Sequence, residues 1–413
     1  MIKKLYLTSN EILFYILPIS IVFSNFFANF TVYYLALFGI YIFYKEKKYI
    51  NKNIINLVFI FWLYISIRSL FTHDVIFSLK SSLPLIRYLF FIIAVSYLIE
   101  NVKNLVRIFT FIFFSFVLLL FIDAFVQFTF GKNLFGYTES VNNRNSSFFK
   151  GRFVLGSYIS KIILISFILL NSYLPFNKFK LIYIFISLIS LGIILISGDR
   201  ASLGLYLLSL FTILILMDKR YMTFYQKFLS LCLSLFFTFL IIFSVENFKT
   251  RFYFQTLNDI SGADKVLYFS KGHQSHWKTS YKMFLDNKLF GKGPNMFRLI
   301  CDQKEFNSGK KSCSTHPHNY HVQLLGETGI IGYFLFLSLF LMILFHLIRQ
   351  FYYVYIKNDI YLSFNKIILL SLTFSNFWPI ITTGNIFSSF TLNLVFISLA
   401  FYFFDEKSIS NTK

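Results

Sequence analysis

Long apolar segments recur along the whole chain and constrain its fold more than any other feature. A helix needs about 20 mostly apolar residues to cross the hydrocarbon core of a bilayer. Because 56% of the 413 residues are hydrophobic and only 14% are charged, we predict an all-α polytopic membrane protein with about twelve transmembrane helices. The predicted helices cover residues 12–29, 30–44, 54–71, 83–99, 104–129, 154–173, 180–197, 201–217, 228–244, 320–348, 366–383 and 386–404.

One long polar segment, residues 245–319, separates the ninth predicted helix from the tenth. We therefore predict transmembrane helices 1–9 in residues 1–244, a loop domain in residues 245–319, helices 10–12 in residues 320–404 and a tail in residues 405–413. The N-terminal stretch begins with MIKK and lacks a small-residue cleavage site, so we expect a retained first helix rather than a cleaved signal peptide.

The Lys and Arg residues of the short loops predict the orientation in the membrane, because such residues are in excess in cytoplasmic loops. The basic loops lie on the same side as both termini, so that side is predicted to be cytoplasmic and the long loop extracytoplasmic. These residues are Lys45, Lys47, Lys48, Lys52, Lys178, Lys180, Lys219, Arg220, Lys227, Arg349, Lys357 and Lys366.

The formal net charge of +21 has two predicted sources, the basic cytoplasmic loops and a basic long loop on the outer face. A basic surface is also typical of nucleic-acid-binding proteins, but here it lies at a membrane face, which argues against nucleic acid as a partner. We expect membrane lipids as partners, and in particular anionic lipid phosphate.

Several cations fall near the outer ends of the predicted helices. Arg68 and Arg87 lie near helix ends, Lys161 lies about two turns into the next helix, and Arg251 opens the long loop in FKTRFYF. Ionisable groups in membrane helices usually face a cavity or a partner, because burial in hydrocarbon is costly. Two interpretations stay open for Arg68 and Arg87: each extends to the interface as a snorkelling side chain, or it contributes with Lys161 to a phosphate site.

Arg200 lies in ISGDRAS, in the short connection between two predicted helices on the outer side. A tight turn at Gly198 and Asp199 does not itself require an arginine. Arg200 therefore either forms a surface ion pair with Asp199 or binds a ligand. A guanidinium group is planar, always charged and able to bind in a bidentate way, so a set of cations at one membrane face suits a pyrophosphate.

Three of the seven histidines, His316, His318 and His321, lie in CSTHPHNYHVQ, where the tenth predicted helix begins. A metal site is one interpretation, but Pro317 and the helix that follows spread the rings over different faces, and no Cys or Asp cluster accompanies them. A pH-sensing or structural role is a second. The third, which we favour, is general-base catalysis, in which one imidazole takes a proton from a sugar hydroxyl.

The same stretch predicts a helix start, with Ser314 or Thr315 as the N-cap and Pro317 at the first helical position. His318 then lies in the first turn, where the helix dipole disfavours imidazolium and keeps the ring neutral. In an unbroken helix Glu327 lies about 180° around the axis from His318 and cannot orient it.

Small and sulfur-containing residues flank the histidines. Gly326, Gly329 and Gly332 recur at every third position, which favours close packing of helices. Cys301 and Cys313 either form a disulfide, which an oxidising compartment permits, or are two free thiols.

A helix predicted at about residues 275–287 places Trp277, Tyr281 and Phe284 on one stripe. This stripe either lies on the membrane and covers a lipid substrate, or packs against the helix bundle.

The segment HNYHVQLLGETGIIGY resembles the pattern described for O-antigen ligases, which is His, then Asn, Ser or Gln, nine residues, G-x-x-G, and Thr or Tyr. His318, Asn319, Gly329, Gly332 and Tyr333 fill these positions. The preceding HWKTSYKMFLDNKLFGKGPNMF and the segment SGDRAS also resemble stretches of this superfamily.

The resemblance implies a GT-C-like glycosyltransferase of lipopolysaccharide biosynthesis in the bacterial inner membrane. Its donor would be a glycan on undecaprenyl pyrophosphate at the periplasmic face, and its acceptor a sugar hydroxyl of the lipid A core. By resemblance, His318 would be the base, and Arg200 and Arg251 would hold the pyrophosphate and stabilise its developing charge. His316, Asn319, His321, Trp277 and Glu327 are further candidates for substrate contact. The reaction would need no metal and no cofactor.

Other functions stay open at this point. The superfamily also contains O-antigen polymerases, whose acceptor is a second lipid-linked glycan, and oligosaccharyltransferases that modify protein Ser or Thr. A transporter is a different class, and it predicts inverted repeats and ionisable groups at the membrane midplane. We find no clear internal repeat, and the ionisable groups gather at one face.

Overall fold

The protein is helical throughout the part that the structure describes. Helices make up 76% of this computed structural model, and no sheet occurs among the described residues. The predicted fold class, an all-α polytopic membrane protein, is confirmed. The structure describes residues 2–46, 52–138, 143–171, 180–261, 269–309, 311–382 and 384–402.

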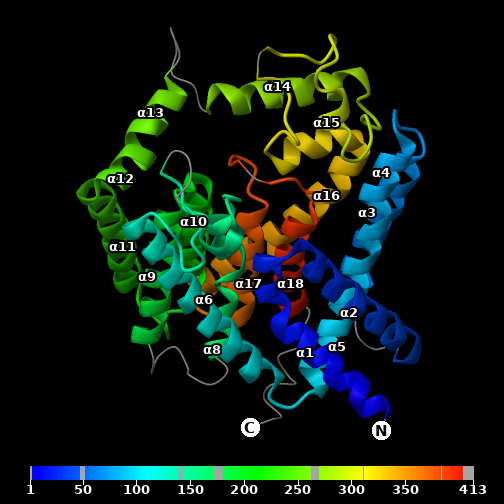
Figure 1. Ribbon diagram of the computed structural model, residues 1–413. Helices are drawn as coiled ribbons and strands as arrows, with labels where there is room; N and C mark the ends of the chain where they lie inside the picture. The colour runs from blue at the N-terminus through cyan, green and yellow to red at the C-terminus, as the bar shows by residue number, and fades with distance from the viewer. Residues whose placement is uncertain are drawn as a thin grey trace.

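The apolar segments form a bundle of helices (Figure 1). Six of the described helices are long and apolar enough to cross a membrane, so the count of twelve crossings stays a prediction. The bundle consists of α1 (Ile2–Phe23), α2 (Asn25–Lys45), α3 (Lys52–Ser69), α4 (Val75–Ser82), α5 (Ile86–Asn101), α6 (Leu105–Phe130), α7 (Leu155–Ile162), α8 (Ile165–Asn171), α9 (Lys180–Ser197), α10 (Arg200–Leu216), α11 (Phe224–Ser244), α16 (Tyr320–Tyr352), α17 (Phe364–Asn376) and α18 (Ser389–Tyr402).

Some helix boundaries differ from the prediction. The first two helices meet at Ser24 rather than near residue 29, because the Ser24 side chain accepts a hydrogen bond from the backbone N–H of Phe27 and starts a new helix. The predicted helix at 154–173 is divided into α7 and α8, and α17 ends at Asn376, earlier than predicted. Apolar composition locates the segments, whereas these ends depend on caps and breaks.

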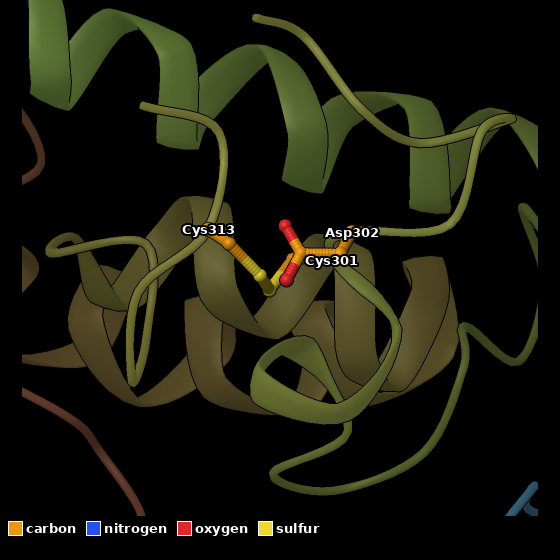
Figure 2. Close-up of side chains that lie close together, drawn as sticks. All are labelled: Cys301, Asp302 and Cys313. Atoms are coloured by element: carbon orange, nitrogen blue, oxygen red, sulfur yellow. A yellow bond between two sulfur atoms is a disulfide. The ribbon is translucent and has the colours of Figure 1, made fainter. Parts of the chain in front are cut away.

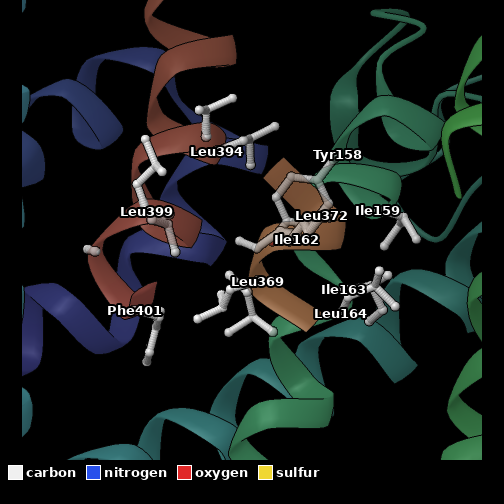
Figure 3. Close-up of a cluster of buried hydrophobic side chains, with 14 of the residues drawn as sticks. Tyr158, Ile159, Ile162, Ile163, Leu164, Leu369, Leu372, Leu394, Leu399 and Phe401 are labelled. Carbon is white, nitrogen blue, oxygen red and sulfur yellow. The ribbon is translucent and has the colours of Figure 1, made fainter. Parts of the chain in front are cut away.

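The centre of the bundle is closely packed where α7, α17 and α18 meet. Tyr158 and Ile162 of α7 lie there with Leu372 of α17 and Leu394 of α18, all without solvent exposure (Figure 3). The helices of this core carry the segments that surround the candidate site.

The long loop folds over one end of the bundle, which we call the loop face. It contains α12 (Glu246–Phe248), a π-helix (Lys249–Phe254), α13 (Gln255–Ile260), α14 (Lys271–Asp286) and α15 (Phe297–Ile300). Helix α14 lies across the top of the molecule in Figure 1, and the N-terminus lies at the opposite end. At that opposite end two basic loops meet, since the Lys219 ammonium donates to the Asn358 side chain and that of Lys227 donates to the Tyr355 hydroxyl.

Candidate active site

His318 lies just before helix α16, not inside it. Asn319 is the N-cap, because its side-chain oxygen accepts a hydrogen bond from the N–H of Val322 at 3.0 Å. The predicted cap at Ser314 or Thr315 is therefore wrong. The Asn319 amide also donates to the carbonyls of Pro379 and Ile381 at 2.7 and 3.1 Å, so a segment distant in sequence selects this residue as the cap.

Four imidazoles gather at the loop face, and we call them the histidine cluster: His273, His276, His316 and His318. The His318 ring centroid lies 4.1 Å from that of His316, 5.2 Å from that of His273 and 5.6 Å from that of His276. His273 and His276 were not among the residues predicted from the sequence. The sequence could have indicated them, because two histidines three residues apart on a helix lie on the same face.

His318 is held neutral by its surroundings. Burial, and to a smaller extent the nearby imidazoles of His316, His273 and His276, lower the pKa of His318 to about 3. The sequence predicted a neutral His318 from the dipole of a helix that contains it. The ring is neutral for other reasons, namely desolvation and crowding with other imidazoles.

A group of three arginines lies beside the histidine cluster, around the turn at Gly198. Arg251 donates its Nε–H to the Gly198 carbonyl at 2.8 Å. Arg200 donates to the Thr256 hydroxyl at 2.9 Å and forms an ion pair with Asp259 at 2.6 Å. We call Arg144, Arg200 and Arg251 the arginine group.

The predicted alternative of an Asp199–Arg200 pair is wrong. The Asp199 carboxylate caps α10 instead, accepting from the N–H of Ser202 at 3.2 Å and from its hydroxyl at 2.7 Å. Arg200 therefore pairs with residues of the long loop, and 29% of its side chain is exposed.

Arg144 is the member of the arginine group that sequence reasoning missed. A side chain at Gly198 would come within 3.2 Å of the Arg144 Cγ, so glycine lets the two segments approach. Arg144 donates to the Phe153 carbonyl at 2.9 Å, and its buried Nε has no hydrogen-bond partner among the described residues. No local pattern around Arg144 indicated this contact, which depends on the fold.

The arginine group carries more positive charge than its acidic neighbours balance. Burial, followed by the nearby Arg200 and Arg144, lowers the pKa of Arg251 to about 10, against the opposing effect of Asp199 and Asp259. Three cations thus crowd against two carboxylates, one of which caps a helix. An anion placed between the guanidinium groups would relieve this repulsion and accept their hydrogen bonds.

His273 connects the two groups. Burial lowers its pKa, as do His276 and Arg200, while Asp259 raises it. His273 therefore interacts electrostatically with the ion pair of the arginine group and also lies 5.2 Å from His318. A ligand that contacts Arg200 lies close to the histidine cluster.

Arg68 and Arg87 are bound within the protein, so the snorkelling interpretation is wrong for both. Only 9% of Arg68 and 6% of Arg87 is exposed. Arg68 donates to the carbonyls of Phe290, Phe71 and Gly291 and so anchors the turn before α15 to α3. These contacts give Arg68 a positioning role.

Lys161 is buried inside α7, below the arginine group. Only 2% of the residue is exposed, and it interacts electrostatically with Asp199. It lies beneath the turn that carries Gly198 rather than at the surface of the site.

His321 is not part of the histidine cluster. One ring nitrogen pairs with the Tyr333 hydroxyl at 3.1 Å and the other with the Phe377 carbonyl at 2.8 Å. The three histidines of the motif therefore do not converge on one point, as the metal interpretation would require. Instead His321 joins α16 to the segment after α17.

Glu327 is fully buried beneath the loop domain. Its carboxylate accepts hydrogen bonds from the N–H groups of Asn295 at 3.1 Å and Phe297 at 2.8 Å. Glu327 thus holds the turn that precedes α15, in place of the predicted contact with substrate.

The glycines of the motif permit close packing, and α16 is kinked at one of them. Gly329 has φ 64° and ψ −169°, a conformation that strongly favours glycine. A Cβ there would lie 2.3 Å from the Leu289 carbonyl oxygen, and one at Gly326 would lie 2.3 Å from the Ser280 hydroxyl. The predicted unbroken helix is wrong, because the chain bends to accommodate the turn at residues 289–291.

Cys301 and Cys313 form a disulfide, with Cα atoms 5.1 Å apart (Figure 2). It joins the end of α15 to the chain five residues before His318. Asp302 lies beside the disulfide, and potential metal-ligand atoms of Cys301, Asp302 and Cys313 lie within 4.8 Å of one another. Both sulfurs are bonded to each other and are not thiolate ligands.

Trp277 packs against Phe269, with ring centroids 4.4 Å apart, and its buried Nε1 has no partner among the described residues. Tyr281 is 56% exposed on the same helix. The residues of the predicted stripe therefore differ: Trp277 packs against another side chain, whereas Tyr281 is exposed.

These features define a polytopic membrane protein with a histidine cluster around a neutral His318 and a crowded arginine group at one end of its bundle. Residues 185–337 match the family model described as O-antigen ligase, which supports the predicted resemblance to the O-antigen ligase superfamily. Members of this family are glycosyltransferase-like membrane enzymes. The match includes His273, His318, Arg200 and Arg251, whereas Arg144 lies outside it. No curated protein matches the chain.

Proposed function

We propose that the protein is an O-antigen ligase of the bacterial inner membrane. It transfers a glycan from undecaprenyl pyrophosphate to a sugar hydroxyl of the lipid A core, with the loop face in the periplasm and both termini in the cytoplasm. The observation that carries this proposal is a neutral imidazole, His318, that contacts His273, which in turn interacts electrostatically with Arg200 of the crowded arginine group. Transfer from a pyrophosphate requires a base and an anion site side by side.

His318 acts as the general base. Its neutral ring accepts the proton of the acceptor hydroxyl while the hydroxyl oxygen forms a bond to the anomeric carbon of the donor sugar. The bond from that carbon to the pyrophosphate oxygen breaks, and the leaving pyrophosphate retains the electron pair. Asn319 positions the base, because the same side chain caps α16 and binds the carbonyls of Pro379 and Ile381.

The arginine group binds the pyrophosphate and stabilises its developing charge. Arg200 and Arg251 lie on different elements, α10 and the π-helix, so they can bind the phosphates from two sides. Arg144 supplies a third guanidinium group, whose buried Nε has no hydrogen-bond partner within the described part of the chain. Positive groups that are already in place where charge develops lower the barrier without reorganisation.

Donor binding also makes His318 a stronger base. In the empty site the ring is desolvated and surrounded by imidazoles, which keeps its pKa near 3. An anionic pyrophosphate beside the cluster favours imidazolium and raises this pKa. The acceptor hydroxyl is therefore deprotonated efficiently only when the donor is present.

A deletion strain tests the choice of acceptor. If the protein is the ligase, long glycan chains still form but stay on the lipid carrier, and the lipid A core is bare. A core that carries a single repeat unit and no ladder would identify a polymerase. Unchanged lipopolysaccharide together with a glycoprotein that has lost its sugar would identify a protein glycosyltransferase. A core that still carries full-length glycan in the deletion strain would refute the ligase proposal.

A further inference from the structure

The hydroxyl of Ser314 contacts the ring of His318 at one of its two nitrogens. The His318 Nε2 lies 3.2 Å from the Ser314 Oγ, and the same hydroxyl donates to the His316 carbonyl at 3.1 Å. A hydroxyl has one proton to donate and two lone pairs, whereas a carbonyl can only accept. Ser314 therefore lies between a carbonyl that needs a donor and a ring nitrogen that is a donor in one tautomer and an acceptor in the other.

The two contacts of Ser314 together select one tautomer of the His318 ring. If Nε2 carries the proton, it donates to the Ser314 oxygen while the hydroxyl donates to the His316 carbonyl, and both hydrogen bonds form. If Nδ1 carries the proton, Nε2 needs the same hydroxyl proton as the carbonyl, and one of the two hydrogen bonds is lost. Because an unmade hydrogen bond in a partly buried site is costly, the Nε2–H tautomer is favoured.

The backbone holds both partners of this contact in place. Cys313, the residue before Ser314, is tied by the disulfide to Cys301 just after α15. His318 has φ 58°, a left-handed conformation that is uncommon for a residue with a side chain, and Pro317 fixes its own φ directly before it. Since Ser314 is held independently of the ring, its hydroxyl can set the orientation and the tautomer of His318.

His318 differs from the other rings of the histidine cluster in the nitrogen that the protein contacts. In the other three rings this nitrogen is Nδ1, which lies 2.7 Å from the Ser270 hydroxyl in His273, 3.2 Å from the Ser312 carbonyl in His276 and 2.9 Å from the Thr315 hydroxyl in His316. The Nδ1 of His318 makes no hydrogen bond with the described residues, and part of the residue stays accessible to solvent. In the Nε2–H tautomer this open nitrogen carries the lone pair of the ring.

We propose that Ser314 is a positioning residue, which holds the His318 ring with its proton on Nε2 so that Nδ1 is the atom that takes the proton of the acceptor hydroxyl. The inference rests on the proposed function, because it names the basic atom of the proposed base. It also assigns a role to a serine that belongs to neither the histidine cluster nor the arginine group.

The Ser314 hydroxyl also stabilises the ring while it reacts. As the Nδ1 lone pair takes the proton of the sugar hydroxyl, the sugar oxygen forms its bond to the anomeric carbon and His318 becomes imidazolium. The Nε2–H then donates to the Ser314 oxygen from a charged ring, and such hydrogen bonds are about twice as strong as neutral ones. Ser314 therefore favours the protonated ring, and Nδ1 returns its proton to water after the product leaves.

Nitrogen NMR measures the tautomer directly. The full-length protein is labelled with nitrogen-15 histidine and measured in detergent near neutral pH, where His318 is neutral because its pKa is about 3. A protonated ring nitrogen and an unprotonated one differ clearly in chemical shift, and the signals of His318 are those that His318→Asn lacks. A protonated Nε2 and an unprotonated Nδ1 are expected. The reverse assignment would overturn the proposal.

Three variants test the role of the hydroxyl, and thermal unfolding in detergent verifies that each is folded. Ser314→Ala should lower kcat roughly tenfold, the value of one hydrogen bond to a group that becomes charged, without changing KM for donor or acceptor. Ser314→Thr retains a hydroxyl and should recover most of the rate. The control is Thr315→Ala, which removes a hydroxyl that contacts His316 and should behave as wild type. A wild-type kcat in Ser314→Ala, or an equal loss in Ser314→Thr, would overturn the proposal.

The spectra of the variants separate this proposal from the transfer reaction itself. Ser314→Ala should increase the fraction of His318 rings that carry the proton on Nδ1, which a purely structural serine would not change, whereas Thr315→Ala should not. This shift supports the assignment of the tautomer to Ser314 even if the protein transfers no glycan, in which case the proposed function alone fails. An unchanged His318 tautomer in folded Ser314→Ala would overturn the role of Ser314 even if the enzyme proves to be a ligase.

Discussion

Replacing His318 with asparagine is the most direct test of the proposed base. The His318 backbone has φ 58°, in the left-handed region, where an alanine would cost roughly 1–2 kcal/mol. Asparagine tolerates this conformation, so the variant retains the backbone and loses only the base. A positioned general base contributes about 10²–10⁴-fold to a rate, and kcat should fall by that factor.

The pH dependence follows from the buried position of the ring. Only neutral imidazole accepts a proton, so activity is lost as pH falls through the pKa of His318 in the folded protein. The profile of kcat/KM reports the free enzyme, in which that pKa is about 3. It should therefore stay flat from about pH 8 to about pH 5, across the region near 6.5 where an ordinary histidine titrates. The profile of kcat reports the complex, in which bound pyrophosphate raises the pKa, so its acid limb should lie at higher pH.

Transfer is measured with purified protein in vesicles as radiolabelled glycan moved from undecaprenyl pyrophosphate to lipid A core. His316→Ala is the control, because it removes a neighbouring imidazole of the same cluster. A folded His318→Asn protein with kcat within about tenfold of wild type would refute the base role. An acid limb of kcat/KM near pH 6.5 that disappears in this variant would retain the base but refute the electrostatic argument.

Four further outcomes are expected. Arg200→Lys retains the charge but cannot bind Thr256 and Asp259 together, so kcat should fall roughly 10–100-fold, the value of one charged hydrogen bond; a fully active variant would mean that Arg200 acts only as a diffuse charge. Glu327→Gln presents an NH₂ group to one of two buried N–H donors, so unfolding measured in detergent should require about 1–3 kcal/mol less; an unchanged melting temperature would contradict its positioning role. Reduction of the Cys301–Cys313 disulfide, or the double alanine variant, should lower activity by releasing the segment before His318, whereas Cys232→Ala should not. Activity should survive EDTA, and a loss restored by a divalent ion would contradict the metal-independent mechanism.

The sequence by itself determined the membrane class, the long loop and the motif that places His318 and Asn319 at the start of a helix. These features are local. A run of apolar residues predicts a spanning helix from its own length, and a polar stretch of 75 residues between such runs cannot be one of them. Arg200 and Arg251 were found for a similar reason, because each stands out as a cation at the outer end of an apolar segment.

Only the tertiary structure decided which groups meet. Arg144 and His273 come from segments that no local pattern links to His318. Arg144 joins the site at the Gly198 turn, and His273 joins it through the contact of its ring with that of His318. The sequence suggested that Arg68 and Glu327 contact substrate, but the fold uses both to hold the turns at 290–297. A buried ion must find partners wherever the chain supplies them, and the nearest carbonyl or N–H in space is often distant in sequence. The neutral state of His318 has the same origin, since desolvation depends on everything that packs around a ring, whereas a helix dipole depends only on the neighbouring residues.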